Sequence, residues 1–297
     1  MKSKAIFDRW SHIQYHSWPF QMYKQYNEEL SAYIWAEYAA HKFAYQQLGN
    51  ARAHWNDTIQ QYVLMPDHIW NFADLKVWSD AFNGQQNFLY LNCVMALSSN
   101  FESFLESILS LAIESDPGAM LGASRSIDGV YLLKHKMLKK DAYRKKIKEC
   151  SKGVWSERKK CIKELIGAYP QELDQYESEL EKIRILRNKV GHAFGRDIKK
   201  ARNFESLDKI PMEHVSLTKI KKWLDVTFSV ATAMDSFLLD RMIGEYQAIL
   251  AYHNNKSKWE NMKLGEQVVA LKKFYGEKDQ PLGKQFCRSL IEYYQAL

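Results

Sequence analysis

The chain has 297 residues, of which 46% are hydrophobic and 13% aromatic. This composition supplies a sizeable core and excludes a disordered chain, and the length allows one large domain or a core domain with extensions. The formal net charge is +7, a balance that favours an anionic partner without identifying one.

The N-terminal part of the chain is rich in tryptophan, with six of the nine Trp residues before position 82. Apolar and aromatic residues recur at three- and four-residue steps over 20–48, which predicts one long amphipathic helix. We expect its aromatic stripe to pack against a neighbouring helix. A shorter helix is expected near 57–64, and Pro66 is expected to begin another.

The middle of the chain carries the most apolar helix. The dipeptide Asn83-Gly84 predicts a turn, and a strong helix is expected after it, from about 86 to 114. Glu102 and Glu106 lie one turn apart on this helix. One of them could orient a basic side chain of a site, and a partly buried pair at the helix surface is the alternative.

Further helices with few turns between them are expected up to the C-terminus. They are expected at about 130–149, 155–167, 170–192, 218–252, 257–275 and 284–296. No alternation of period two is sustained anywhere, so the sequence predicts an all-α protein.

Positive charge is concentrated in one stretch of the chain. Between positions 134 and 160 there are 12 Lys or Arg and 3 acidic residues. Such a cluster is typical of a surface that binds a polyanion, and equally of a solvated helix face. If the partner is RNA, the residues expected to contact it are Lys139, Lys140, Arg144, Lys145 and Lys146.

The stretch RILRNKVGHAFGRD, residues 184–197, ends the helix expected over 170–192. At 100° per residue, its apolar residues fall on one face, which we expect to be buried. The opposite face carries polar residues, namely Arg184, Asn188 and His192, with Arg187 on the flank. Ile185 is an apolar residue within this polar face, which favours a face that meets a partner.

These residue types suit cleavage of RNA without a metal. Imidazole titrates near neutral pH, so His192 could move a proton. The guanidinium of Arg187 matches phosphate oxygens and could stabilise the charge that develops there. Asn188, one turn before the histidine, could hold its ring or a ligand oxygen. Attack by the ribose 2′-hydroxyl would restrict the substrate to RNA.

The segment RNKVGH resembles the R-x₄₋₆-H signature of the HEPN superfamily, in which Asn commonly follows the Arg. The segment SNFESFLESIL, residues 99–109, is similar to the first core helix of larger HEPN families. The resemblance covers about 85–245. A second R-x₆-H pattern, from Arg9 to His16, lacks the Asn and the preceding long helix, and we interpret it as a chance match.

The resemblance implies a four-to-five-helix bundle that dimerises so that two motifs face one another. It also implies a metal-independent endoribonuclease of a toxin or phage-defence system, with Arg187, Asn188 and His192 at its site. Glu102, Glu106 and Arg184 are expected to support that site. A non-catalytic HEPN subunit that binds RNA or protein is the alternative. In a purely structural interpretation, Arg187 pairs with an acidic residue and His192 caps the helix end.

The expected organisation has three parts: a Trp-rich helical extension over 1–82, a HEPN-like core over 83–245 and C-terminal helices over 246–297. The expected partners are RNA, a second copy of the chain and an antitoxin or defence-system protein. No cofactor, metal or membrane is expected. The four cysteines lack C-x₂-C spacing and are expected to be reduced structural thiols, in a cytoplasmic protein.

Overall fold

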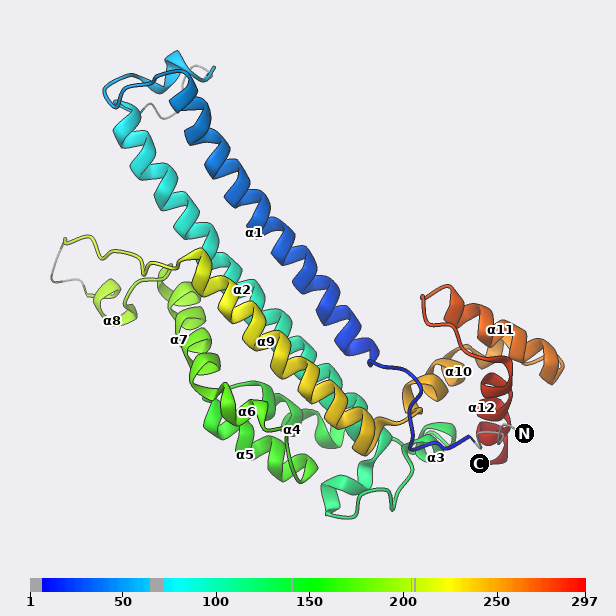
Figure 1. The fold of residues 1–297 in the computed structure, drawn as a ribbon. Helices are drawn as coiled ribbons and strands as arrows, with labels where there is room; N and C mark the ends of the chain where they lie inside the picture. Colours follow the sequence, from blue (N-terminus) through cyan, green and yellow to red (C-terminus); the bar gives the residue numbers. More distant parts are fainter. Residues whose placement is uncertain (1–6, 65–71, 140, 204, 206) are drawn as a thin grey trace. The chain divides into compact units, whose positions relative to one another are not determined.

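Figure 1 shows the fold in a computed structural model, which describes residues 7–64, 72–139, 141–203, 205 and 207–297. The described residues form helices and no strand, which confirms the all-α prediction. The helix expected to begin at Pro66 lies outside the described residues. The elements are α1 (Trp18–Asn50), η1 (Ile59–Gln61), α2 (Leu75–Ser115), η2 (Pro117–Leu121), α3 (Gly129–Lys134), α4 (Asp141–Ser151), α5 (Trp155–Ile166), α6 (Glu172–Gln175), α7 (Glu177–Ala193), α8 (Ile198–Ala201), α9 (Leu217–Leu238), the π-helix η3 (Leu239–Ile243), α10 (Tyr246–Trp259), α11 (Leu264–Gly276) and α12 (Lys284–Ala296).

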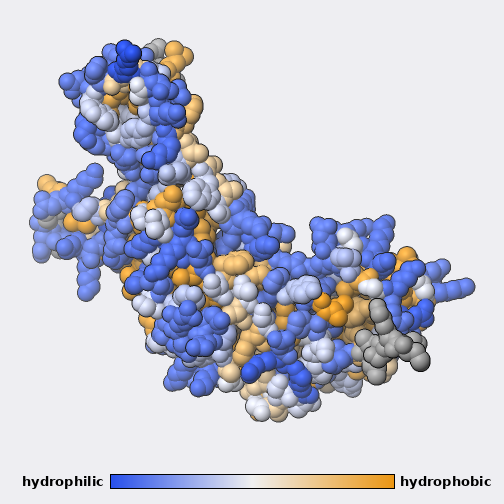
Figure 2. All heavy atoms as spheres, viewed as in Figure 1, coloured by the Kyte–Doolittle hydropathy of each residue, from blue (hydrophilic) through white to orange (hydrophobic). Residues whose placement is uncertain are grey.

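The helices form two compact units, each assembled from segments that are distant in sequence. Unit 1 contains residues 1–23, 101–177 and 228–297, and unit 2 contains residues 24–100 and 178–227. The three consecutive parts expected from the sequence remain a prediction. In the view of Figure 2, hydrophilic side chains predominate on the surface, and the apolar ones form small groups among them. No described helix combines the length and the apolar character needed to cross a membrane.

In unit 2, the helices α1 and α2 run side by side (Figure 1). The Tyr45 hydroxyl and the Ser79 Oγ are 2.7 Å apart, and the His41 Nε2 lies 3.1 Å from the Asn83 Oδ1. The His41 and Phe82 rings stack with their centroids 4.5 Å apart. His41 and Tyr45 therefore pack against a neighbouring helix, whereas Tyr26, Tyr33 and Phe43 of α1 are exposed, so the expected packing of the aromatic stripe holds only in part.

The turn predicted at Asn83-Gly84 is wrong, because both residues lie inside α2. Asn83 is occupied by partners within unit 2, since its amide nitrogen lies 3.5 Å from Ser79 and its oxygen is bonded to His41 on α1. Glycine inside a helix costs only about 1 kcal/mol relative to alanine. Packing of α1 against α2 outweighs this local preference.

The single helix predicted over 218–252 is divided in the structure. The helix α9 ends at Leu238, a π-helical turn follows, and Gly244 adopts a φ of +49° before α10 begins. A Cβ atom at Gly244 would lie 2.4 Å from the Arg9 carbonyl oxygen. The break therefore makes room for the N-terminal segment of unit 1, which crosses the chain here.

Arg9 anchors that N-terminal segment. Its guanidinium is almost fully buried, and donates to Asp128 at 3.2 Å, to the Ile243 carbonyl at 3.0 Å and to the Ser115 carbonyl at 2.9 Å. His16 lies 3.1 Å from the buried carboxylate of Asp235. These contacts give both residues of the Arg9–His16 pattern a structural role in unit 1.

Candidate functional site

The helix α7 carries the sequence motif, and its apolar face places it in unit 2. Leu180, Ile183 and Leu186 are buried, whereas Val190 is partly exposed. The carboxylate of Glu179 accepts a hydrogen bond from the Trp223 indole of α9 at 3.0 Å. The buried stripe and this polar contact fix α7 against α9.

The helix predicted over 170–192 is two helices in the structure. Tyr176 leaves helical geometry, with a φ of −106° and a ψ of 6°, so that α6 ends before it and α7 begins after it. The ammonium of Lys159 in α5 donates to Asp174 before the break and to Glu177 after it, each at 2.6 Å. The Lys159 ammonium thus binds one carboxylate in α6 and one in α7, on either side of the break at Tyr176.

The three residues expected to be catalytic lie in the last two turns of α7. The Arg187 guanidinium donates to the Asn188 Oδ1 at 3.3 Å, and both side chains are partly exposed. The His192 side chain is exposed and makes no hydrogen bond within the described part of the chain. Its imidazole is therefore accessible to solvent.

Helix geometry decides which of these side chains act together. Asn188 and His192 are four residues apart and project within about 40° of one another. Arg187 and His192 are five residues apart and project about 140° apart. One copy of α7 therefore presents Asn188 and His192 on one face, with Arg187 joined to that face through its bond to Asn188.

The end of α7 has a specific local cause. Phe194 and Gly195 adopt φ values of +51° and +77°, which stop the helix directly after Ala193. A Cβ atom at Gly195 would lie 2.8 Å from the Leu91 Cδ1 of α2, and the φ of +77° is a conformation that favours glycine. A positive φ is a strained conformation for phenylalanine, which lies two residues beyond His192.

The loop after α7 is attached to the same helix end. Lys189 forms an ion pair with Glu213, and the Glu213 backbone amide donates to the Gly195 carbonyl at 2.8 Å. Asn87 of α2 donates to the Glu213 carbonyl and accepts from the Val215 amide, each at 2.9 Å. These contacts attach the C-terminal end of α7 to α2 and to the segment before α9 within unit 2.

Two apolar side chains accompany the polar motif at the surface. Ile185 is 44% exposed and Phe194 is 64% exposed. Ile185 is the apolar residue within the polar face of α7, and no part of unit 2 covers it fully. Exposed apolar side chains beside polar ones are typical of contact sites, although single ones are also common on ordinary surfaces.

The expected supporting residues have partners of their own. Arg184 binds Glu181 through two nitrogens, at 2.9 and 2.5 Å. Within unit 1, Glu102 accepts from Arg158 at 3.0 Å and Glu106 accepts from Ser151 at 2.6 Å. These carboxylates therefore fix α5 and the end of α4 to α2, and their expected support of the motif remains a prediction.

Four of the five residues expected to contact RNA lie on or just before α4 in unit 1. Lys140 lies outside the described residues, whereas Lys139 and Lys145 are exposed. Arg144 pairs with Asp141 at 3.2 Å, and Lys146 pairs with Glu164 of α5 at 2.8 Å. The last two cations are thus partly neutralised by carboxylates of the same unit.

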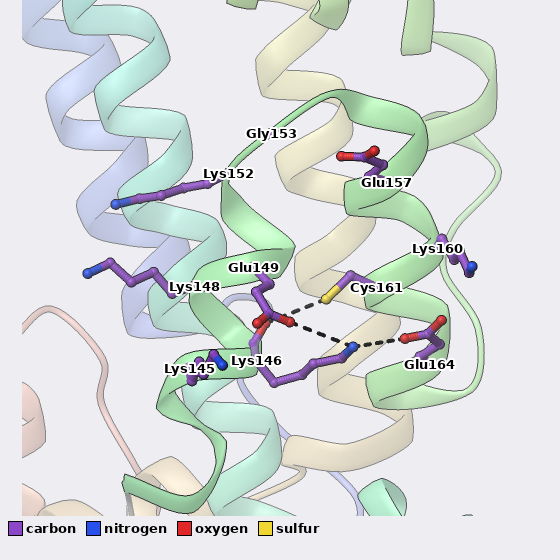
Figure 3. Close-up of a pocket in the computed structure, with 10 residues that line it drawn as sticks. All are labelled: Lys145, Lys146, Lys148, Glu149, Lys152, Gly153, Glu157, Lys160, Cys161 and Glu164. Carbon is purple, nitrogen blue, oxygen red and sulfur yellow. Dashed lines mark hydrogen bonds and ion pairs between the residues drawn. The ribbon is translucent and has the colours of Figure 1, made fainter.

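A surface hollow lies between α4 and α5 (Figure 3). It has a volume of about 540 Å³. Five lysines line it together with three glutamates: Lys145, Lys146, Lys148, Lys152, Lys160, Glu149, Glu157 and Glu164. The Cys161 side chain also lines it, and its sulfur lies 3.5 Å from the Lys146 carbonyl oxygen. The hollow thus combines several cations with one thiol.

Several features of the sites were not predicted from the sequence. The contact between Glu179 and Trp223 joins residues 44 positions apart and has no local signature. The positive φ of Phe194 also has no signature in the sequence. Only Gly195, which follows it, indicates that a helix ends nearby. The side chains of Cys150 and Cys161 meet, with Sγ atoms 2.6 Å apart, although their spacing matches no cysteine motif.

Among the described residues, no group of three or more His, Cys, Asp or Glu side chains is arranged to hold a metal ion. No protein-family model matches this chain, and no curated protein or solved structure matches it either.

Proposed function

We propose that this protein is a metal-independent endoribonuclease of HEPN type. It cleaves RNA by attack of a ribose 2′-hydroxyl on the adjacent phosphate. The observation that carries the proposal is the accessible His192 imidazole one turn beyond Asn188, which is itself bonded to the Arg187 guanidinium. This arrangement joins a proton-transfer group, an amide and a phosphate-binding cation at one helix end.

Each residue has a distinct task in the proposed reaction. His192 accepts or donates the proton that moves between the 2′-hydroxyl and the leaving oxygen. Arg187 donates to the phosphate oxygens, where negative charge increases in the transition state. Asn188 orients the guanidinium through its 3.3 Å bond and offers its amide nitrogen to a ligand oxygen. The products would be a 2′,3′-cyclic phosphate and a free 5′-hydroxyl.

The active form is proposed to be a homodimer in which two α7 helices face one another. Because Arg187 and His192 project about 140° apart, one helix does not direct both side chains at one phosphate. When two α7 helices face one another, Arg187 of one copy and His192 of the other can both point at the same phosphate. The exposed Ile185 and Phe194 side chains supply apolar contact area for such a pairing.

The proposed biological role is that of a toxin or phage-defence effector, with an antitoxin or defence-system protein as its partner. The basic residues on and before α4, among them Lys139 and Lys145, are proposed to bind the RNA backbone. The HEPN-like bundle and this role rest on the sequence motif and on the accessibility of its residues. Growth arrest on expression, relieved by His192→Ala, is the expected cellular result.

The test is an RNA cleavage assay in the presence of EDTA. The His192→Ala variant should lose about hundredfold or more of the rate, which is the usual contribution of a general acid or base. His54→Ala, which removes another exposed histidine of unit 2, should cleave at the wild-type rate. Equal cleavage by wild type and His192→Ala would refute the assignment. Binding of RNA without cleavage at any protein concentration would instead support a non-catalytic HEPN subunit.

A further inference from the structure

The α4–α5 hairpin of unit 1 brings two cysteine thiols into direct contact. Cys150 is fully buried near the end of α4, and Cys161 is 8% exposed on α5. Their Sγ atoms are 2.6 Å apart, and a disulfide bond would bring them to about 2.0 Å. A bond between them would need only a small movement of the two side chains.

The two thiols differ in their access to solvent. Cys161 lines the lysine-rich hollow of about 540 Å³ between α4 and α5, whereas Cys150 is not part of its lining (Figure 3). Burial raises the pKa of the Cys150 thiol, and its hydrogen bond with Cys161 adds to this effect. Cys161 is therefore the thiol that meets a reagent first, and Cys150 lies directly behind it.

We propose that Cys150 and Cys161 form a redox-active pair, which small anionic disulfides such as oxidised glutathione convert to an intramolecular disulfide. The Cys161 thiolate attacks one sulfur of the reagent, whose S–S bond breaks, and one glutathione thiolate leaves and takes up a proton. The Cys150 thiolate then attacks the Cys161 sulfur and releases the second glutathione as a thiol. The two cysteines are oxidised, the reagent is reduced, and the two cysteine protons end on the two released thiols.

The surroundings of the pair favour an anionic reagent. Lys148 and Lys152 line the hollow, are exposed and form no ion pair with any described residue. Lys160 lines it from α5 (Figure 3). These ammonium groups attract the carboxylates of glutathione.

The other two cysteines lack this arrangement. Burial raises the pKa values of both Cys93 and Cys287 to about 11. Neither sulfur contacts another cysteine in the structure. They therefore serve as internal controls, because all four cysteines are free thiols that differ mainly in pairing and access.

The first test treats the reduced full-length chain with oxidised glutathione and maps its peptides without reduction. Trypsin should release the segment 149–152 linked to the segment 161–163, with the loss of two hydrogen atoms. The Cys150→Ser variant should instead retain one glutathione on Cys161, and Cys161→Ser should retain none. Circular dichroism checks that both variants fold. An unlinked pair in the wild type, or glutathione retained by Cys161→Ser on Cys150, would overturn the proposal.

A second test addresses the lysines. The double variant Lys148→Gln, Lys152→Gln should react several-fold more slowly than wild type with oxidised glutathione. Its rate with cystamine, a cationic disulfide, should equal that of wild type. The matched control replaces two exposed lysines of another hollow of unit 1, Lys272 and Lys284, and should react as wild type does. Equal rates for both double variants would overturn the role of the lysines. The pair and its tests do not depend on RNA cleavage, so either proposal can fail alone.

Discussion

The indole nitrogen of Trp223 donates a hydrogen bond of 3.0 Å to the carboxylate of Glu179, and this bond joins α9 to the motif helix α7. The same carboxylate accepts from Lys182 at 2.8 Å and from Lys222 at 3.0 Å. Trp223 is almost fully buried, so the bond also satisfies a polar atom at the edge of the unit 2 core. Glu179 is thus a charged anchor for the helix that carries Arg187 and His192.

This anchor predicts a specific dependence of stability on pH. Hydrogen bonds from Lys182, then Lys222 and Trp223, lower the pKa of Glu179 from 4.5 to about 2. Because the folded pKa is below the unfolded one, the stabilisation is fully present above pH 4.5 and is lost as the pH falls towards 2. Glu179→Gln keeps an acceptor for the indole but removes the charge.

The free energy of unfolding of Glu179→Gln should therefore be lower than that of wild type by about 1–2 kcal/mol at pH 7, a range that allows for solvent screening. The difference should shrink when the same urea titrations are run at pH 3. Glu205→Gln, which changes an exposed carboxylate of unit 2, should match wild type at both pH values. A constant difference across this pH range would contradict the role of the charge.

Elements with strong periodicity were well predicted from the sequence. The helix expected over 20–48 is Trp18–Asn50, and that expected over 284–296 is Lys284–Ala296. In both, apolar residues recur at helical spacing, and no distant segment interrupts the helix. The exposed face with Asn188 and His192 also followed from helical spacing alone.

The errors have tertiary causes. The break at Gly244 accommodates the backbone of Arg9, more than 200 positions away in the sequence. Asn83 lies inside α2, where it is bonded to His41 of α1. The contact between Cys150 and Cys161 depends on how the α4–α5 hairpin closes. Local propensity contains no information on such contacts, so these features required the structure.

Gly244 should be one of the least replaceable residues of unit 1. Gly244→Ala would place a methyl group against backbone atoms of Arg9 and Trp10, at a φ of +49°. We expect a loss of about 1–3 kcal/mol in the free energy of unfolding, because the new atom meets backbone that cannot rotate away. Gly265→Ala at the start of α11 meets no atom within 4 Å and should be neutral or stabilising. Chemical denaturation of the two variants checks the contrast, and equal effects would contradict it.

Ile185 tests the proposed pairing of α7 helices. Because its side chain is 44% exposed, Ile185→Asp should change the free energy of unfolding by less than about 0.5 kcal/mol. It should nevertheless convert the proposed dimer to a monomer in sedimentation equilibrium, since a facing pair of carboxylates repels, and RNA cleavage should fall with it. Val269→Asp, at a 55% exposed position on α11, should keep both the dimer and the activity. An Ile185→Asp dimer as tight as wild type would exclude this face as the contact.

The basic residues before and on α4 make the proposed RNA binding sensitive to salt. Lys139 and Lys145 are exposed, and neither forms an ion pair with a described residue. If each contacts one phosphate of single-stranded RNA, the double variant Lys139→Gln, Lys145→Gln should lower the slope of log affinity against log salt by about 1.4. Filter binding of His192→Ala protein measures this slope without cleavage. The control variant Lys272→Gln, Lys284→Gln changes the net charge of unit 1 by the same amount and should keep the wild-type slope. If it lowers the slope equally, the effect comes from net charge and not from contacts at α4.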